Sequence, residues 1–109
     1  MAFTIKDWNI KEMTGYEPVT TFFTDFSIAD AFGVSAIKDT YKRAFDAWKT
    51  NLKFVTELSM VLNWKGWQHH GEGNEKYSKL YFSLWEKHHN WCMRNLTDDD
   101  LTYYFNTTD

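Results

Sequence analysis

The chain has 109 residues, a net charge of −3 and a single cysteine. This length predicts one domain with a core of its own, and an aromatic share of 19% excludes a disordered chain. The negative charge argues against a general nucleic-acid binder, because such proteins need basic residues to neutralise phosphates.

The cellular setting follows from the same composition. Cys92 cannot form an internal disulfide, which indicates a reducing compartment. The first residues lack the regions of a signal peptide, and Asn63 and Lys65 interrupt the longest apolar run. We therefore expect a soluble cytoplasmic protein that makes no use of a membrane.

The first part of the chain is expected to be mostly irregular. Gly15, Pro18 and several threonines predict an irregular or extended segment over residues 1–24. Thr24 or Asp25 can then cap a short helix over residues 26–32, which ends at Gly33.

One long helix is predicted over about residues 35–69, with Ser35 as its N-cap. Its apolar positions recur every three or four residues: Ile37, Tyr41, Ala44, Trp48, Leu52, Val55 and Leu62. From Phe54 onward Met60, Trp64 and Trp67 add apolar groups on the other sides of the helix. A helix that is apolar all round is buried all round, so its second half should form the centre of the bundle.

Two more helices follow a break at residues 71–74. The apolar spacing predicts a helix over 75–95, antiparallel to the long helix because the loop is short. Thr97 caps a final short helix with Asp98, Asp99 and Asp100 in its first turn. The expected fold is all-α: one domain over residues 1–109, a small bundle with two long antiparallel helices and shorter terminal helices.

Residues 26–45 resemble a helix-turn-helix in their first half. Ile28, Ala29, Gly33 and Val34 have the spacing of that motif. The second helix of the motif would bury Asp39 and Lys42, whereas the apolar pattern places Ile37 and Tyr41 inside. That orientation cannot present the helix N-terminus to a major groove, so we expect no sequence-specific binding of duplex DNA.

Two spacings could belong to a metal site. Glu86 and His89 have the Glu-x-x-His spacing of di-iron bundles, but no second such pair exists. His88 and Cys92 are one turn apart, yet His69 and His70 would lie roughly 20 Å away along the neighbouring helix. The chain also lacks phosphate-loop and nucleophile motifs. We therefore expect no metal, no cofactor and no enzymatic activity, although metal bridging between two chains stays open.

Two groups of residues are candidates for contact with a partner. Lys38, Lys42, Lys49 and Lys53 would form a stripe on the long helix, either to bind an acidic partner or as a solvated face. Beside the glycine-rich turn lie Trp64, Trp67, His69 and His70. Tryptophan is enriched in binding hot spots, although these two could instead close that end of the core.

Three segments resemble a family of short uncharacterised proteins from phages and conjugative elements of gut Firmicutes: "WNIKEMTGYEPVTTFFTDFSIADAFG" (residues 8–33), "IKDTYKRAF" (37–45) and "YYFNTTD" (103–109). The resemblance implies a setting and no functional residues. Small single-domain proteins from that setting often inhibit host defence, as anti-CRISPR proteins do.

The expected function is therefore non-enzymatic binding of a macromolecule. The leading hypothesis is a mobile-element inhibitor of a bacterial defence nuclease, whose partner would be a host protein such as an RNA-guided nuclease. The alternative is a helix-turn-helix-like regulator that acts on DNA. The sequence leaves open a homodimer.

Overall fold

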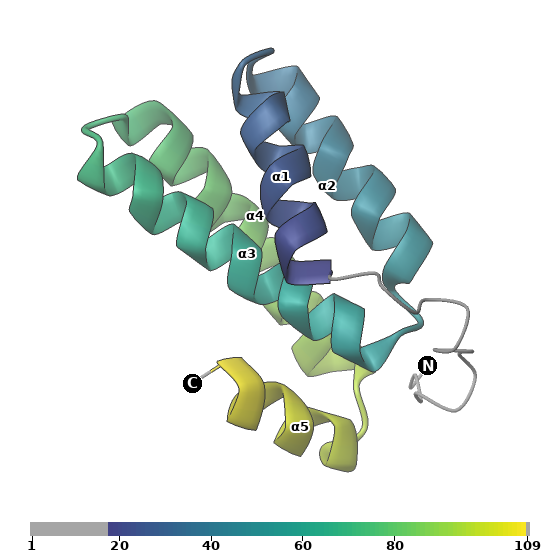
Figure 1. Ribbon diagram of the computed structural model, residues 1–109. Coiled ribbons are helices and arrows are strands. Elements are labelled where there is room, and N and C mark those ends of the chain that lie inside the picture. Colours follow the sequence, from purple (N-terminus) through teal and green to yellow (C-terminus); the bar gives the residue numbers. More distant parts are fainter. Residues whose placement is uncertain (1–17, 109) are drawn as a thin grey trace.

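The computed structural model describes residues 18–108 of the protein, which form five α-helices joined by short turns (Figure 1). The helices are α1 (Pro18–Asp30), α2 (Val34–Trp48), α3 (Leu52–Gly71), α4 (Glu75–Asn95) and α5 (Asp98–Thr108). No strand occurs within these residues. The predicted all-α bundle is confirmed, while the segment expected to be irregular falls largely in residues 1–17, outside the described part.

Helix α1 is longer than the sequence pattern suggested. It begins at Pro18 rather than near residue 25, so the prediction of an irregular chain over residues 18–24 is wrong. Proline suits the first turn of a helix because its fixed φ is already helical and its missing N–H is not needed there. Phe22, Phe26 and Ala29 then share one face, and all three are buried.

The predicted long helix is two helices. The chain reverses direction between α2 and α3 (Figure 1), so a single helix over residues 35–69 is wrong. Asn51 causes the break: its backbone is extended, and its side chain accepts a hydrogen bond of 2.9 Å from the N–H of Phe54. An N-cap of this kind starts a new helix without disturbing the apolar periodicity on either side.

The turn between α1 and α2 depends on glycine. Gly33 has a φ of +108°, which other residues adopt only with strain, and its N–H donates to the carbonyl of Ala29 at 3.1 Å. Gly33 ends α1 as predicted, but it also occupies the N-cap position of α2, so the expected cap at Ser35 is wrong. Ile37 and Tyr41 are buried while Asp39 and Lys42 are exposed, which confirms the predicted inner face.

The last two helices match the sequence expectations. Helix α4 has the predicted bounds, and the side chain of Asn74 caps it by accepting the N–H of Tyr77 at 3.1 Å. Thr97 caps α5, as predicted, by accepting the N–H of Asp100 at 3.2 Å. Tyr104 fixes α5 to the core, where it packs with Leu52, Val55, Cys92 and Leu96.

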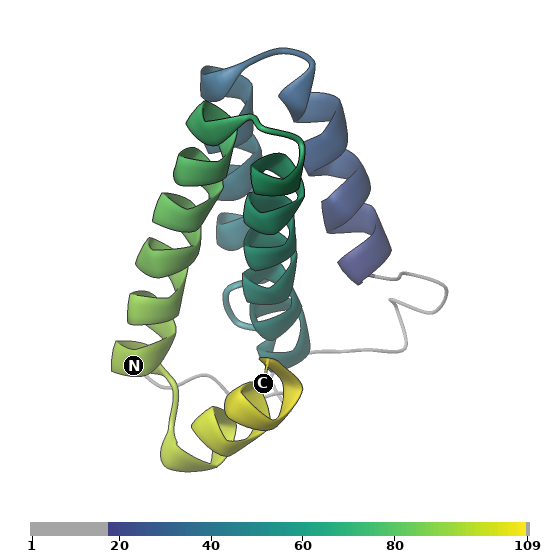
Figure 2. The same cartoon turned by 90° about the vertical axis from the view of Figure 1, so that its left-hand side faces the viewer.

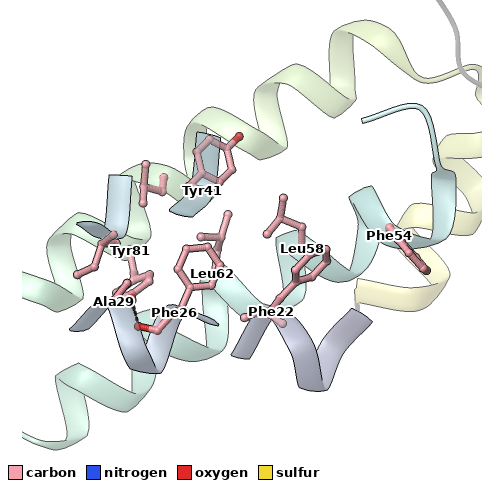
Figure 3. Packing of buried hydrophobic residues seen from close by; sticks show 11 residues of the cluster. Phe22, Phe26, Ala29, Tyr41, Phe54, Leu58, Leu62 and Tyr81 are labelled. Atoms are coloured by element: carbon pink, nitrogen blue, oxygen red, sulfur yellow. Dashed lines mark hydrogen bonds between the residues drawn. The ribbon is translucent and has the colours of Figure 1, made fainter. Parts of the chain in front are cut away.

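The main core is shared by α1, α2, α3 and α4 (Figure 3). Phe26 meets Tyr81 edge to face, with ring centroids 5.6 Å apart, and the carbonyl of Phe26 lies 3.3 Å from the Tyr81 hydroxyl, whose one proton it shares with a closer acceptor, Asp30. Leu58 and Leu62 of α3 and Tyr41 of α2 belong to the same cluster, in which Leu58 lies next to Phe22. Helix α3 contacts each of the other four helices and is the centre of the bundle.

A buried ion pair joins α1 to α3. The ammonium of Lys65 lies 2.6 Å from the carboxylate of Asp30, and the lysine side chain is only 1% exposed. The same carboxylate accepts hydrogen bonds from His69, at 2.9 Å, and from the Tyr81 hydroxyl. The ammonium also lies over the rings of Phe23 and Tyr81. A lysine is rarely buried this completely unless it is paired, and here one carboxylate, the hydroxyl of Ser27 at 3.3 Å and two rings replace its water.

Removing Asp30 should leave a buried cation without its partner. We expect Asp30→Ala to lower the free energy of unfolding by about 3–5 kcal/mol. Adding Lys65→Met should restore part of that loss, with a coupling of about 1 kcal/mol or more in a double-mutant cycle measured by urea unfolding. Strictly additive losses would contradict the idea that Lys65 depends on Asp30.

Gly66 allows α3 and α4 to approach closely. A Cβ at this position would lie 2.6 Å from the Phe82 ring, and the Ser78 hydroxyl donates to the Gly66 carbonyl at 2.9 Å. Gly71 is also in α3, but a Cβ there would meet nothing within 4 Å.

This difference gives a matched pair of variants. Both Gly66→Ala and Gly71→Ala gain helix propensity, but only the first overpacks against Phe82. We expect Gly66→Ala to be less stable than Gly71→Ala by about 1–3 kcal/mol in urea unfolding. Equal stabilities would show that Phe82 moves aside at no cost.

Candidate functional site

Three large aromatic side chains face solvent on the α3 and α5 side of the protein. Trp64 is 44% exposed and Trp67 is 58% exposed, both on α3, and Phe105 of α5 is 40% exposed. The expectation that α3 buries its apolar groups on all sides is therefore wrong. Trp64 and Trp67 are three residues apart and so adjacent on the helix. We call Trp64, Trp67 and Phe105 the aromatic surface.

A groove of about 490 Å³ runs beside this surface between α3, α4 and α5. Trp64 and Phe105 border it, together with Met60, Trp85 and His89. Among the described residues that line it there is no Asp, Glu, Lys or Arg. The groove suits apolar and hydrogen-bonding groups of a partner better than charged ones.

A hydrogen-bonded group holds the floor of the groove in place. The hydroxyl of Tyr104 lies 2.7 Å from Oγ of Ser59 and 2.9 Å from Nδ1 of His89. The His89 ring in turn stacks on Trp85, with ring centroids 4.9 Å apart. Burial raises the pKa of Tyr104 to about 12, so the phenol keeps its proton at neutral pH. Three helices thus fix the side chains on which the groove is built.

The predicted cluster at the end of the bundle is only partly on the surface. The Trp67 ring packs edge to face against Phe82 at 5.2 Å and against His70 at 5.6 Å between centroids. His70 is exposed and lies 3.0 Å from a carboxylate oxygen of Glu75. His69 points the other way: it is buried, pairs with Asp30 and cannot contact a partner.

The predicted lysine stripe is divided between helices. Lys42 is exposed on α2, whereas Lys49 is the C-cap of that helix, with its ammonium 5.7 Å from the centre of the Phe45 ring. Lys53 belongs to α3 and lies 4.0 Å from Glu57. The break at Asn51 therefore separates Lys53 from the other two, and a continuous stripe on one helix is not formed.

Phe105, Trp85 and Met60 were not among the candidates predicted from the sequence. Apolar spacing indicates that α5 folds back on the core, but it does not indicate where on α3 and α4 the helix docks. The groove beside Trp64 depends on that docking, so its other walls could not be predicted.

The residues with metal-like spacing are engaged in the fold. Nε2 of His88 donates to the Val55 carbonyl at 2.7 Å, because a carbonyl can only accept, and Nδ1 then accepts the Tyr41 hydroxyl at 3.0 Å. Cys92 is buried, and burial raises the pKa of its thiol to about 12, which disfavours the nucleophilic thiolate. Within residues 18–108 no three His, Cys, Asp or Glu side chains are grouped to hold a metal ion.

None of the helices over residues 18–108 combines the length and hydropathy that crossing a bilayer requires. Comparisons of the chain with protein-family models, with curated proteins and with solved structures gave no match.

His88 makes stability depend on pH. Burial lowers its pKa from 6.5 to about 4, so the unfolded chain binds this proton more readily than the folded protein does. The free energy of unfolding therefore has its full value above pH 6.5. It falls as the pH is lowered toward 4, by about 3 kcal/mol in total. In urea unfolding at several pH values, His88→Gln should lose stability less steeply than the wild type over this range. Parallel curves would contradict a buried neutral His88.

Proposed function

We propose that the protein is a non-enzymatic binding protein that contacts another protein through the aromatic surface. The observation that carries this proposal is the exposure of Trp64 and Phe105 at the border of one uncharged groove, with the exposed Trp67 one turn from Trp64 on α3. Grouped exposed apolar residues with polar surroundings are typical of interaction sites. Tryptophan in particular supplies much of the binding energy where it becomes desolvated at the centre of an interface.

The surroundings of these side chains support the same proposal. Phe82 and His70 pack against the Trp67 ring, and Gly66 is what allows Phe82 to lie there. Trp85 and His89 form a stacked wall of the groove. A surface that is already ordered loses less conformational entropy when a partner binds, which favours affinity.

The narrower form of the proposal is inhibition of a bacterial defence nuclease in the host cytoplasm. Its support is the family resemblance of residues 8–33, 37–45 and 103–109. We do not extend the proposal to a DNA-binding regulator. Asp39 and Lys42, which a recognition helix would bury, are exposed on α2, and the net charge is −3.

The test compares three tagged forms of the protein as baits in a bacterial lysate, with captured proteins quantified by mass spectrometry. We expect Trp67→Ala to reduce capture of the specific partner at least tenfold, since truncation of a hot-spot tryptophan costs about 2 kcal/mol or more. Phe32→Ala is the matched control, because Phe32 is an exposed aromatic residue, 78% accessible, in the turn between α1 and α2. Circular dichroism should show that both variants stay folded.

Three results would count against the proposal: no protein captured specifically by the wild type, equal loss with Trp67→Ala and Phe32→Ala, or a dimer in sedimentation experiments that Trp67→Ala dissociates. The last result would assign the aromatic surface to a second copy of this chain. The inhibitor form further requires that the captured protein is a nuclease whose cleavage falls when the wild type is added.

A further inference from the structure

A second groove, of about 590 Å³, lies between α2 and α4. Both helices start at the end of the bundle that carries the two glycine turns and run toward the opposite end (Figure 2). Lys38 and Lys42 of α2 line the groove, and Lys87 and Arg94 of α4 line it as well. Each of the two helices therefore supplies two cations.

The charge of this groove is opposite to that of the whole molecule. Asp46 is the single acidic residue among the described lining residues, against four cations, while the chain as a whole carries −3. Opposite charge concentrated in a concave site raises the local concentration of an anionic ligand and its rate of association. The occupant should accordingly be acidic.

The floor of the groove is apolar and already packed. Phe45 stacks on Tyr41 with centroids 5.9 Å apart and meets Trp91 edge to face at 4.9 Å. The ammonium groups of Lys87 and Lys49 lie over the rings of Tyr41 and Phe45. Single-stranded nucleic acids bind by stacking bases on open ring faces, and the faces of Tyr41 and Phe45 are covered by these neighbours.

The spacing of the cations matches carboxylates on a helix. Lys38 and Lys42 are four residues apart, about 6 Å along the axis of α2, and Lys87 and Arg94 are seven residues apart, about 10 Å along α4. Acidic residues one or two turns apart on a docked helix would have the same spacings. Two parallel helical walls with an apolar floor form the kind of groove in which amphipathic helices bind.

We propose that the α2–α4 groove binds an acidic amphipathic helix of a protein partner. The apolar stripe of that helix would lie against the half-buried Trp91, with its carboxylates beside Lys42 and Lys87. This site is separate from the aromatic surface, and its test does not depend on the proposed function.

The experiment measures fluorescence anisotropy with a labelled 20-residue helical peptide that carries a leucine stripe flanked by glutamates. A second peptide has lysines in place of the glutamates, and labelled oligo-dT of 20 nucleotides serves as the nucleic-acid probe. We expect the glutamate peptide to bind at least tenfold more tightly than either of the others, and its affinity to fall as salt is added.

Two charge-reversed variants locate the site. Lys42→Glu with Lys87→Glu should weaken binding of the glutamate peptide at least tenfold. Lys76→Glu with Lys79→Glu makes the same change in net charge at exposed α4 positions outside the groove and should weaken it less than threefold. Trp67→Ala should leave this binding unchanged.

Other outcomes overturn the proposal. Tighter binding of oligo-dT, lost in the groove variant, would make this a nucleic-acid site. Absent binding of the glutamate peptide, or equal losses in both charge-reversed variants, would exclude a specific site for an acidic helix. Loss of peptide binding in Trp67→Ala would move the contact to the aromatic surface.

Discussion

The contact between Asp30 and Lys65 determines how the central helix is oriented. Asp30 is the last residue of α1, and its carboxylate holds Lys65 and His69 of α3 and Tyr81 of α4 at one point. A buried lysine without this carboxylate would be strongly unfavourable. Because residues of an α-helix are about 100° apart, turning Lys65 inward directs its neighbours Trp64 and Trp67 away from α1. The two tryptophans are therefore exposed because Lys65 is buried.

The remaining parts of the aromatic surface come from distant positions in the chain. Gly66 brings α4 close enough for Phe82 to support Trp67, and the Thr97 cap starts the helix that carries Phe105 to the rim of the groove beside Trp64. Tyr104, one residue earlier, is buried, and its hydroxyl is hydrogen-bonded to Ser59 and His89. These bonds hold α5 in the position where it forms one wall of the groove. A partner would meet a surface ordered by α3, α4 and α5 together.

Local signals in the sequence predicted much of the fold and little of the site. The helix over 75–95, the cap at Thr97, the turn at Gly33 and the inner face with Ile37 and Tyr41 all follow from nearby residues. The break at Asn51 could not be predicted in this way, because the three- and four-residue spacing of apolar positions continues across it. Nor did the burial of Lys65, since a lysine is expected at the surface until its distant partner Asp30 is known. The exposed position of Trp64 and Trp67 depends on that long-range pair and was therefore beyond periodicity arguments.

Helix α4 separates two surfaces of different chemistry. Trp85 and His89 lie on the side that faces the uncharged groove, and Leu84, Lys87, Trp91 and Arg94 on the side that faces the basic one. Between them the buried residues Tyr81 and His88 attach α4 to the core. Counting about 100° per residue, the two exposed sides point in roughly opposite directions, so occupation of one groove leaves the other accessible. A single rigid helix can in this way present an apolar contact and an electrostatic contact to two different molecules, and substitutions on one side should act on one partner alone.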